Sequence, residues 1–420
     1  MNNLPLKDSR LRLPELLMLL ATLTAPFLMV HVKAITLYDG FVFLAFVALL
    51  ARGKEIRFLE GKLLFPLLVL SVLVLVATFR APKPVESLFS LAQILFIFLI
   101  QMPAMCTILN NKRQQLLNFR AFVFSVVAIV IWGCIHIAMS GGTALARLEF
   151  PYTNPNHLGF VLAIGGPFFL AWLTQGEKKA RRAWKWAVLL GAFVLLALTG
   201  SRSSWLAFFL STSMYLALIT ASKHNLRHII RTALKYGLIL AGVLIAVYLL
   251  FPSSIIQSRV QMSLDWDSPL IQNRVTGIIA ALGALDDYAL VGIGLDNFQY
   301  VIGAYTPAQL SFKLTRKTHN TYLLYCVQTG FFGMVTFVLL LGLFYKRMFM
   351  GLRLIAKRDI QYQLMAACLS SFSSVVVISM FITQITRRLF WLPYGFGLAI
   401  VYSVLSPKRS EASDRDNREG

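Results

Sequence analysis

The feature that most constrains this chain is a series of long apolar blocks, separated by short polar stretches. Blocks of this length match the number of helical residues that crosses the hydrocarbon core of a bilayer. A soluble fold has no means of covering so many helices that are apolar on every side. No small-residue cleavage site closes the first block, 13–30, so it is interpreted as a membrane span and not as a signal peptide. We therefore predict an all-α polytopic membrane protein.

About twelve spans are expected. They are placed at 13–30, 35–51, 63–79, 85–109, 118–139, 157–175, 184–200, 203–221, 233–251, 319–345, 361–385 and 389–405. The predicted organisation is membrane helices over 1–251, an outer loop over 252–318, membrane helices over 319–405 and a disordered polar tail over 406–420.

The basic residues mark the orientation of the chain. A net charge of +22 suggests a nucleic-acid partner, but the basic residues lie in short clusters between apolar blocks. With both termini in the cytoplasm, 28 of the 40 lysines and arginines fall on the cytoplasmic side. This asymmetry follows the positive-inside rule. The clusters are therefore predicted to set topology and contact membrane lipid, and no nucleic-acid partner is expected.

One outer loop differs from the others. Pro252 to Thr318 spans 67 residues and holds five of the eighteen acidic residues. Apolar residues at helical spacing predict an amphipathic helix from Ile271 to Leu285, and a second helix is expected after Asp296. Long ordered loops beside a membrane bundle often carry function.

The sequence Thr199–Ser204 joins two apolar spans with almost no linker. Arg202 is the only charged residue between Trp186 and Lys223. The simple interpretation is a tight turn with an arginine that reaches the headgroups. The functional interpretation is a guanidinium that binds a phosphate, assisted by the hydroxyl of Ser201 and by the free N–H groups of a helix start.

Two further outer positions combine charge with possible chemistry. Arg274 begins the amphipathic loop helix and is either solvated, held by loop aspartates, or a second cation for the same anion. His319 and Asn320 lie where the chain re-enters the membrane, beside Lys317. A histidine at a span end is usually structural, but a neutral imidazole suits a general base near pH 7. Asn320 is a candidate for positioning a sugar hydroxyl or the imidazole ring of His319. Lys317 adds positive charge where the chain re-enters the membrane.

The Asn-Pro-Asn segment before the sixth span is a fourth candidate. Asn156 is expected either to cap the helix or to line a substrate groove. The pairs Arg387–Arg388 and Arg80–Lys83 are weaker candidates for headgroup or phosphate contacts.

Several chemistries lack a sequence signal. There is no Walker P-loop and no GxSxG nucleophile, and no cluster of His, Cys or Asp suggests a metal site. The cysteines are interpreted as membrane-core residues; they are Cys106, Cys134, Cys326 and Cys368.

Four segments resemble motifs of one known family. They are YTNPNHLG (152–159), LTGSRSSWLAFF (198–209), NRVTGIIAALGALDDYALVGIGLDNF (273–298) and THNTYLLYCVQTGFFG (318–333). Their order, sidedness and spacing resemble the bacterial O-antigen ligase and O-antigen polymerase superfamily.

The resemblance implies a metal-independent glycosyltransferase of the GT-C type, without a cofactor, at the periplasmic face of the bacterial inner membrane. Its donor would be a glycan on undecaprenyl diphosphate, and in ligases the acceptor is a lipid A–core sugar. Arg202 and Arg274 would bind the donor diphosphate, and His319 would act as base on the acceptor hydroxyl. Inversion at the anomeric carbon is expected, because direct displacement needs no covalent enzyme intermediate.

One departure separates two activities within the family. Many ligases have a second histidine at the position of Lys317, so this residue favours a polymerase that joins lipid-linked repeat units. The single long outer loop and the Asn-Pro-Asn segment favour a ligase, which is our prediction. Transfer of glycans to proteins is a third possibility within the family.

A lipid-linked oligosaccharide transporter or flippase is the alternative from another class. A carrier should show repeated halves and ionisable residues at mid-span. Here there is no convincing internal repeat, and the polar candidates gather at one face, which favours an enzyme.

Overall fold

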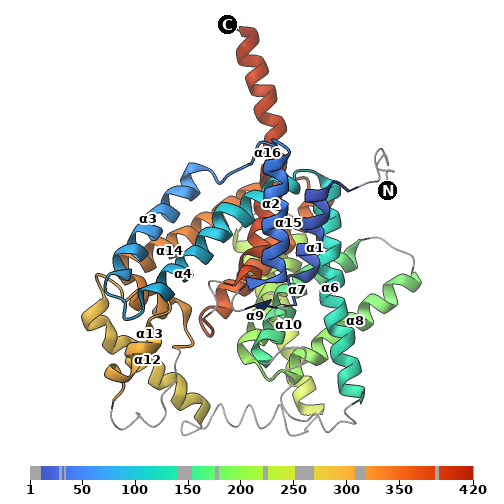
Figure 1. Cartoon of the computed structure of the whole chain (residues 1–420). Helices are drawn as coiled ribbons and strands as arrows, with labels where there is room; N and C mark the ends of the chain where they lie inside the picture. The colour runs from blue at the N-terminus through green and yellow to red at the C-terminus, as the bar shows by residue number, and fades with distance from the viewer. Residues whose placement is uncertain are drawn as a thin grey trace.

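The computed structural model describes residues 11–27, 31–32, 35–139, 154–175, 179–220, 226–250, 269–307, 318–383 and 387–419. Over these residues the chain is predominantly helical, as predicted (Figure 1). The elements are α1 (Leu13–Thr24), β1 (His31–Val32), β2 (Ile35–Thr36), α2 (Leu37–Ala51), α3 (Gly61–Thr78), α4 (Pro84–Phe96), the π-helix η1 (Ile97–Gln101), α5 (Met102–Ile108), α6 (Lys112–Met139), α7 (Pro155–Thr174), α8 (Lys179–Leu198), α9 (Arg202–Thr220), α10 (Leu226–Leu250), α12 (Pro269–Tyr288), α13 (Phe298–Val301), the 3-10 helix η2 (Ile302–Tyr305), α14 (Thr321–Leu354), α15 (Ile360–Ile378) and α16 (Arg388–Glu419).

Each predicted span coincides with a helix, but not every helix is long enough to cross a membrane alone. Within the described residues, eight helical stretches have the necessary length and apolarity: Gly61–Thr78, Pro84–Ile108, Lys112–Met139, Pro155–Thr174, Arg202–Thr220, Thr321–Leu354, Ile360–Ile378 and Arg388–Leu405. The apolar helices α1 and α2 have 12 and 15 residues, fewer than the roughly 20 that a perpendicular span needs. The chain is a multi-pass membrane protein, and a count of twelve spans stays a prediction.

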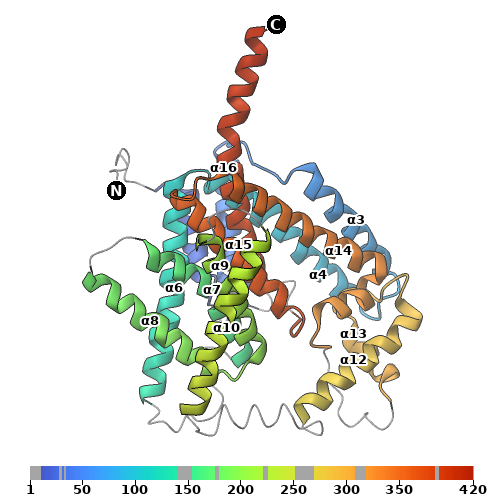
Figure 2. The same cartoon turned by 180° about the vertical axis from the view of Figure 1, so that it is seen from behind.

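The arrangement in space separates two ends of the bundle. The start of α1 and the end of α16 lie at the top of Figure 1, and the loop helices α12 and α13 lie at the opposite end. The view from behind gives the same arrangement (Figure 2). The predicted amphipathic loop helix is confirmed as α12, and the second predicted loop helix as α13.

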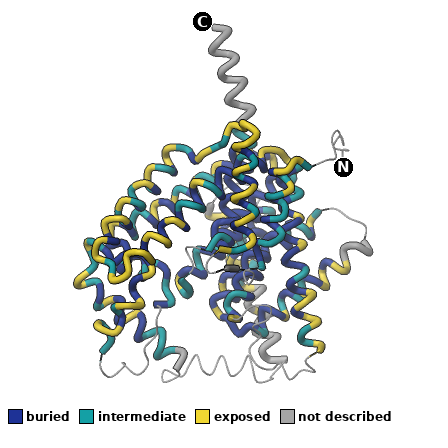
Figure 3. Tube along the Cα trace, in the orientation of Figure 1, coloured by how far each residue is buried: buried dark blue, intermediate teal, exposed yellow. Residues whose placement is uncertain are grey.

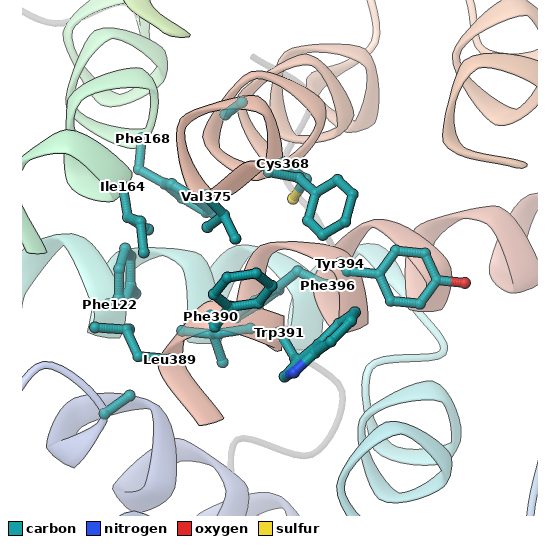
Figure 4. Packing of buried hydrophobic residues seen from close by; sticks show 14 of the residues in the cluster. Phe122, Ile164, Phe168, Cys368, Val375, Leu389, Phe390, Trp391, Tyr394 and Phe396 are labelled. Atoms are coloured by element: carbon teal, nitrogen blue, oxygen red, sulfur yellow. The ribbon is translucent and has the colours of Figure 1, made fainter. Parts of the chain in front are cut away.

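The core of the bundle lies where α6, α7, α15 and α16 meet (Figure 4). The Phe168 ring is 4.9 Å from that of Phe122 and 6.3 Å from that of Phe396, both in edge-on geometry. The outer face of α3 is also apolar, with Phe65 68% exposed, and Figure 3 shows exposed residues along that helix. Apolar residues on both the inner and the outer face of a helix are typical of one that contacts lipid.

Helix α14 is broken at Gly330, where the sequence predicted an uninterrupted span. This glycine has a φ of 73° and a ψ of 172°, so 321–329 and 331–354 are two separate helical segments. A break leaves backbone carbonyls and N–H groups without helical partners. The segment that follows α12 supplies them: Ile293 N donates to Val327 O at 3.0 Å, and Phe331 N donates to Ala289 O at 2.7 Å.

The turn between α3 and α4 holds the same loop from the other side. Arg80 Nη1 donates to the carbonyls of Asp287 and Val291 at 3.1 and 3.3 Å. Lys83 N donates to Asn297 Oδ1 at 2.7 Å. Among their described contacts, Arg80 and the Lys83 backbone therefore fasten the end of α12 to the bundle, where the sequence suggested headgroup or phosphate contacts.

Two local features differ from the sequence prediction. A short antiparallel hairpin, with His31 paired to Thr36, joins α1 and α2, whereas only helices were expected. Helix α16 continues to Glu419, whereas a disordered tail was expected after Leu405. Extending an existing helix needs no new nucleus, so a polar segment can continue a membrane helix.

Gly292→Ala should lower the stability of the folded protein markedly. An added Cβ would lie 2.2 Å from the backbone C and O of Gln328, so the hydrogen bonds between the loop and the break in α14 would be lost. Overpacking of this kind costs about 1–3 kcal/mol or more. Thermal unfolding of the detergent-solubilised full chain would measure the effect.

Gly303→Ala is the matched control, because an added Cβ there meets no atom within 4 Å. Equal melting temperatures for Gly292→Ala and Gly303→Ala would contradict the close approach.

Candidate functional site

Arg202 lies at the tight turn between α8 and α9. Gly200 has a φ of 59°, which reverses the chain directly after α8. Trp205 Nε1 donates to Leu196 O at 2.7 Å and thereby satisfies a carbonyl at the end of α8. Arg202 is the first residue of α9, and its side chain is exposed. The predicted short connection is confirmed, and the charge is directed away from the core.

The neighbouring serines point inward instead. Ser201 is 2% exposed, and its Oγ lies 2.9 Å from Ser204 Oγ. Gly159 of α7 packs so closely that a Cβ there would lie 2.5 Å from Ser204 Oγ. The hydroxyl of Ser201 thus takes part in a buried hydrogen bond at the start of α9, on the side that faces α7. Its suggested contact with a phosphate stays a prediction. Serine is small enough to let these two helices approach.

Arg274 lies on α12 and is electrostatically linked to Arg202. Burial lowers its pKa below the usual arginine value, and the positive charge of Arg202 lowers it further. Among the residues that the structure describes, neither arginine has a carboxylate partner. Asp287, an aspartate of the same loop, accepts a hydrogen bond from the Tyr305 hydroxyl instead. The fold therefore brings two like charges together, an arrangement that a bound anion would stabilise.

His319 has an unusual backbone conformation. Its φ is 54°, in the left-handed region that residues other than glycine rarely adopt. Its neighbours hold this conformation: Thr318 Oγ1 donates to Asn320 O at 2.9 Å, and Asn320 N donates to Thr318 Oγ1 at 3.3 Å. Such strain costs about 1–3 kcal/mol and is concentrated at functional sites. The half-buried imidazole is therefore placed by a backbone conformation that the surrounding structure enforces.

Asn320 is the N-cap of α14. Its Oδ1 accepts a hydrogen bond from Leu323 N at 3.0 Å. The sequence suggested that this side chain positions a sugar, whereas the structure gives its oxygen a local role. Asparagine is among the preferred N-caps because its side chain satisfies an N–H group of the first turn.

The start of α14 is anchored to the end of α15. Thr321 N donates to Ser379 O at 2.8 Å, and Thr321 Oγ1 donates to Ile382 O at 2.5 Å. Tyr322 Oη donates to Val376 O at 2.9 Å. The last carbonyls of a helix have no partner within that helix, and the bonds to Val376 O and Ser379 O satisfy two carbonyls at the end of α15. The bond to Ile382 O holds the chain just beyond α15, and together the three bonds fix the start of α14 beside His319.

Helix α12 and the first segment of α14 pack side by side and run in the same direction. Arg274 precedes Ala289 by 15 residues and His319 precedes Phe331 by 12, and Ala289 and Phe331 are hydrogen-bonded where the two segments end. At 1.5 Å per helical residue, Arg274 and His319 therefore lie toward the same end of the pair. A small buried cluster joins the two helices with the loop: Ala280, Ala281, Ala284, Ile293, Phe298, Ile302 and Val327.

The remaining sequence candidates have different positions. Asn154, and not Asn156, is the N-cap of α7, since Asn154 Oδ1 accepts from Asn156 N at 2.9 Å. Pro155 favours the first helical position and so moves the cap one residue before it. Asn156 is half-buried in the first turn, and Lys317 lies outside the described residues.

The arginine pair at the start of α16 divides into two roles. Arg388 Nε lies 2.8 Å from Asp39 Oδ1, and both side chains are nearly buried, so this arginine ties α16 to α2. Burial lowers the pKa of Arg387, which has no carboxylate partner among the described residues. Asp39 was not among the residues predicted from the sequence, although an acid at the start of an apolar block is a signal for such a pair.

Comparison with known proteins now adds to this geometry. Residues 186–338 match the family model described as O-Antigen ligase. Over these residues the chain is similar to the O-antigen ligase and polymerase superfamily. The matched segment contains Arg202, Arg274 and His319, and it supports the resemblance of the sequence motifs. No curated protein matches the chain. Among the described residues of the chain, no group of three or more His, Cys, Asp or Glu is placed to hold a metal ion.

Substitutions of Asn320 separate a capping role from contact with a ligand. Asn320→Ala should lower the free energy of unfolding by about 1 kcal/mol, and Asn320→Asp should keep most of it, because both Asn and Asp are good N-caps. Thermal unfolding of the full chain measures this difference. If Asn320→Asp were as unstable as Asn320→Ala, the capping role would be wrong.

Proposed function

We propose that this protein is an O-antigen ligase. It transfers a glycan from undecaprenyl diphosphate to a sugar hydroxyl of lipid A–core, at the periplasmic face of the bacterial inner membrane. The observation that carries the proposal is the pair Arg202 and Arg274, which are far apart in sequence. The positive charge of Arg202 acts on Arg274, and neither forms an ion pair with a carboxylate among the described residues.

The arginine pair suits a diphosphate leaving group. The planar guanidinium of arginine makes bidentate contacts to phosphate and stays charged at any physiological pH. Arg202 is exposed at the first turn of α9, where free backbone N–H groups also favour an anion. As the glycosidic bond breaks, negative charge grows on the diphosphate oxygen, and two preorganised cations stabilise that charge.

His319 suits the role of general base. The acceptor oxygen attacks the anomeric carbon, the bond from that carbon to the diphosphate oxygen breaks, and the hydroxyl proton passes to the imidazole. Inversion follows from this single displacement. The enforced backbone of His319 and the anchoring of α14 to α15 hold the imidazole in place before the substrate arrives.

The orientation is part of the proposal. The start of α1 and the end of α16 lie at one end of the bundle, and the loop helices lie at the other (Figure 1). With the basic clusters in the cytoplasm, both termini are cytoplasmic and the site faces the periplasm.

A polymerase is the second candidate. It would use the same donor and the same base, and only the acceptor would differ. Lys317 favours this activity and the long outer loop favours a ligase. A lipid-linked oligosaccharide flippase is the third candidate, and it needs no general base, so a requirement for His319 argues against it.

The first test uses the lipopolysaccharide of a deletion strain. We expect loss of the whole ladder on a gel, with long lipid-linked polymer accumulating. Wild type should restore the ladder and His319→Ala should not. His228→Ala, which removes an exposed histidine of α10, is the control and should restore it.

A core that carries one repeat unit would indicate a polymerase. An unchanged profile in the deletion strain would contradict both activities. Full rescue by His319→Ala would remove the proposed base.

The second test asks whether charge alone is sufficient at the arginine pair. Arg202→Lys should reduce transfer in reconstituted vesicles at least tenfold, because an ammonium group cannot make the bidentate contact. Loss of one such donor typically costs a factor on the order of 100–1,000 in rate. The exposed Arg52→Lys is the control. Full activity of Arg202→Lys would argue against a diphosphate ligand.

A further inference from the structure

A cavity lies at the end of the bundle opposite the arginine pair. It has a volume of about 290 Å³ and is formed where the linker between α2 and α3 meets α16. Figure 1 shows this linker passing beside α16 at the top of the bundle, away from α12 and α13. The linker contributes Glu55, Arg57 and Phe58 to the wall, and α16 contributes Tyr402 and Leu405. The cavity is therefore separate from the proposed transferase site.

Its position corresponds to the headgroup level of a membrane. The apolar stretch of α3 begins at Gly61, immediately after the linker, and that of α16 ends at Leu405. Both helices thus leave the hydrocarbon region at the cavity. Phe58 is 54% exposed beside it, and aromatic side chains are enriched at this depth. A ligand that reaches the cavity from the bilayer would have its polar part here and its apolar part along the helices.

One of the two acidic residues that line the cavity is already neutralised. Glu60, which also lines the cavity, forms an ion pair with Arg347 of α14. Its backbone N–H donates to the Tyr402 hydroxyl at 3.2 Å. Glu60 therefore closes one wall of the cavity and adds little net charge to it.

Arg57 and Glu55 have no such partners within the described part of the chain. Arg57 Nη1 is buried and has no hydrogen-bond partner, an arrangement that costs free energy unless a ligand or water accepts from it. Glu55 is exposed on the same wall and takes part in no described ion pair. The wall thus offers one guanidinium donor and one carboxylate, two residues apart on the linker.

We propose that this cavity binds the headgroup of a zwitterionic phospholipid, with its phosphate on Arg57 and its ammonium group on Glu55. The two opposite charges of a phosphoethanolamine headgroup match the two unpaired charges of the wall. An anionic headgroup without an ammonium group would leave Glu55 unpaired and close to a negative charge. The volume of about 290 Å³ is just below that of typical ligand pockets, which span about 300–1,000 Å³, and suits a small headgroup.

The test is lipid competition on the purified full chain. Phosphatidylethanolamine and phosphatidylglycerol with identical acyl chains are added together, and native mass spectrometry counts the lipids retained. We expect wild type to retain several-fold more phosphatidylethanolamine. Arg57→Gln should lose both lipids, and Glu55→Gln should retain both equally. Lys54→Gln, an exposed neighbour outside the cavity wall, should behave as wild type.

Several outcomes would overturn the proposal. Equal retention of the two lipids by wild type would remove the role of the ammonium group, and an unchanged profile of Arg57→Gln would remove the phosphate ligand. Displacement of the bound lipid by soluble phosphoethanolamine at the same concentration would show that the lipid is not the preferred source of the headgroup. Should Arg57→Gln fail to fold, the wild-type competition and Glu55→Gln still decide the question.

Discussion

The requirement that backbone groups be hydrogen-bonded within the protein underlies the arrangement of the half that carries the loop helices α12 and α13. In a bilayer no water satisfies a broken helix, so a break persists only where other protein segments supply the missing bonds. The break at Gly330 meets this condition through Ala289 and Ile293. Because the loop completes α14, it is held against the bundle, and this fixes α12 and its Arg274. The position of the proposed site thus depends on a backbone interaction away from the charged side chains.

Charge pairing distinguishes structural from functional cations. Arg388 is paired with Asp39 and Arg347 with Glu60, and both pairs connect helices that are distant in sequence. Unpaired burial of a charge is costly, so such pairs are the expected state of an arginine in a membrane protein. Arg202 and Arg274 differ from these because the fold brings them together without a described acid. Arg202 and Arg274 lack a carboxylate partner among the described residues, and this difference from the paired arginines points to an anionic ligand.

Side chains near the proposed site were harder to predict than helices. The sequence placed Ser201 and Asn320 against the substrate, whereas Ser201 is buried beside α7 and Asn320 caps α14. It offered Asn156 either as the cap of α7 or as part of a substrate groove, and the cap is Asn154, two residues earlier. Serine and asparagine serve equally well as caps, helix contacts or ligand donors. Their roles depend on which groups lie within about 3 Å, and the order of residues does not specify this.

The amino-acid sequence predicts the helices, their apolar faces and the two loop helices, because burial in lipid and helical periodicity depend on residues close along the chain. It also singled out Arg202, Arg274 and His319 as polar positions between apolar blocks. The tertiary structure alone decided that α14 is broken, that Arg202 and Arg274 share one environment and that Arg388 finds Asp39. These relations join segments separated by tens to hundreds of residues. They depend on how helices pack against one another, which local sequence patterns do not record.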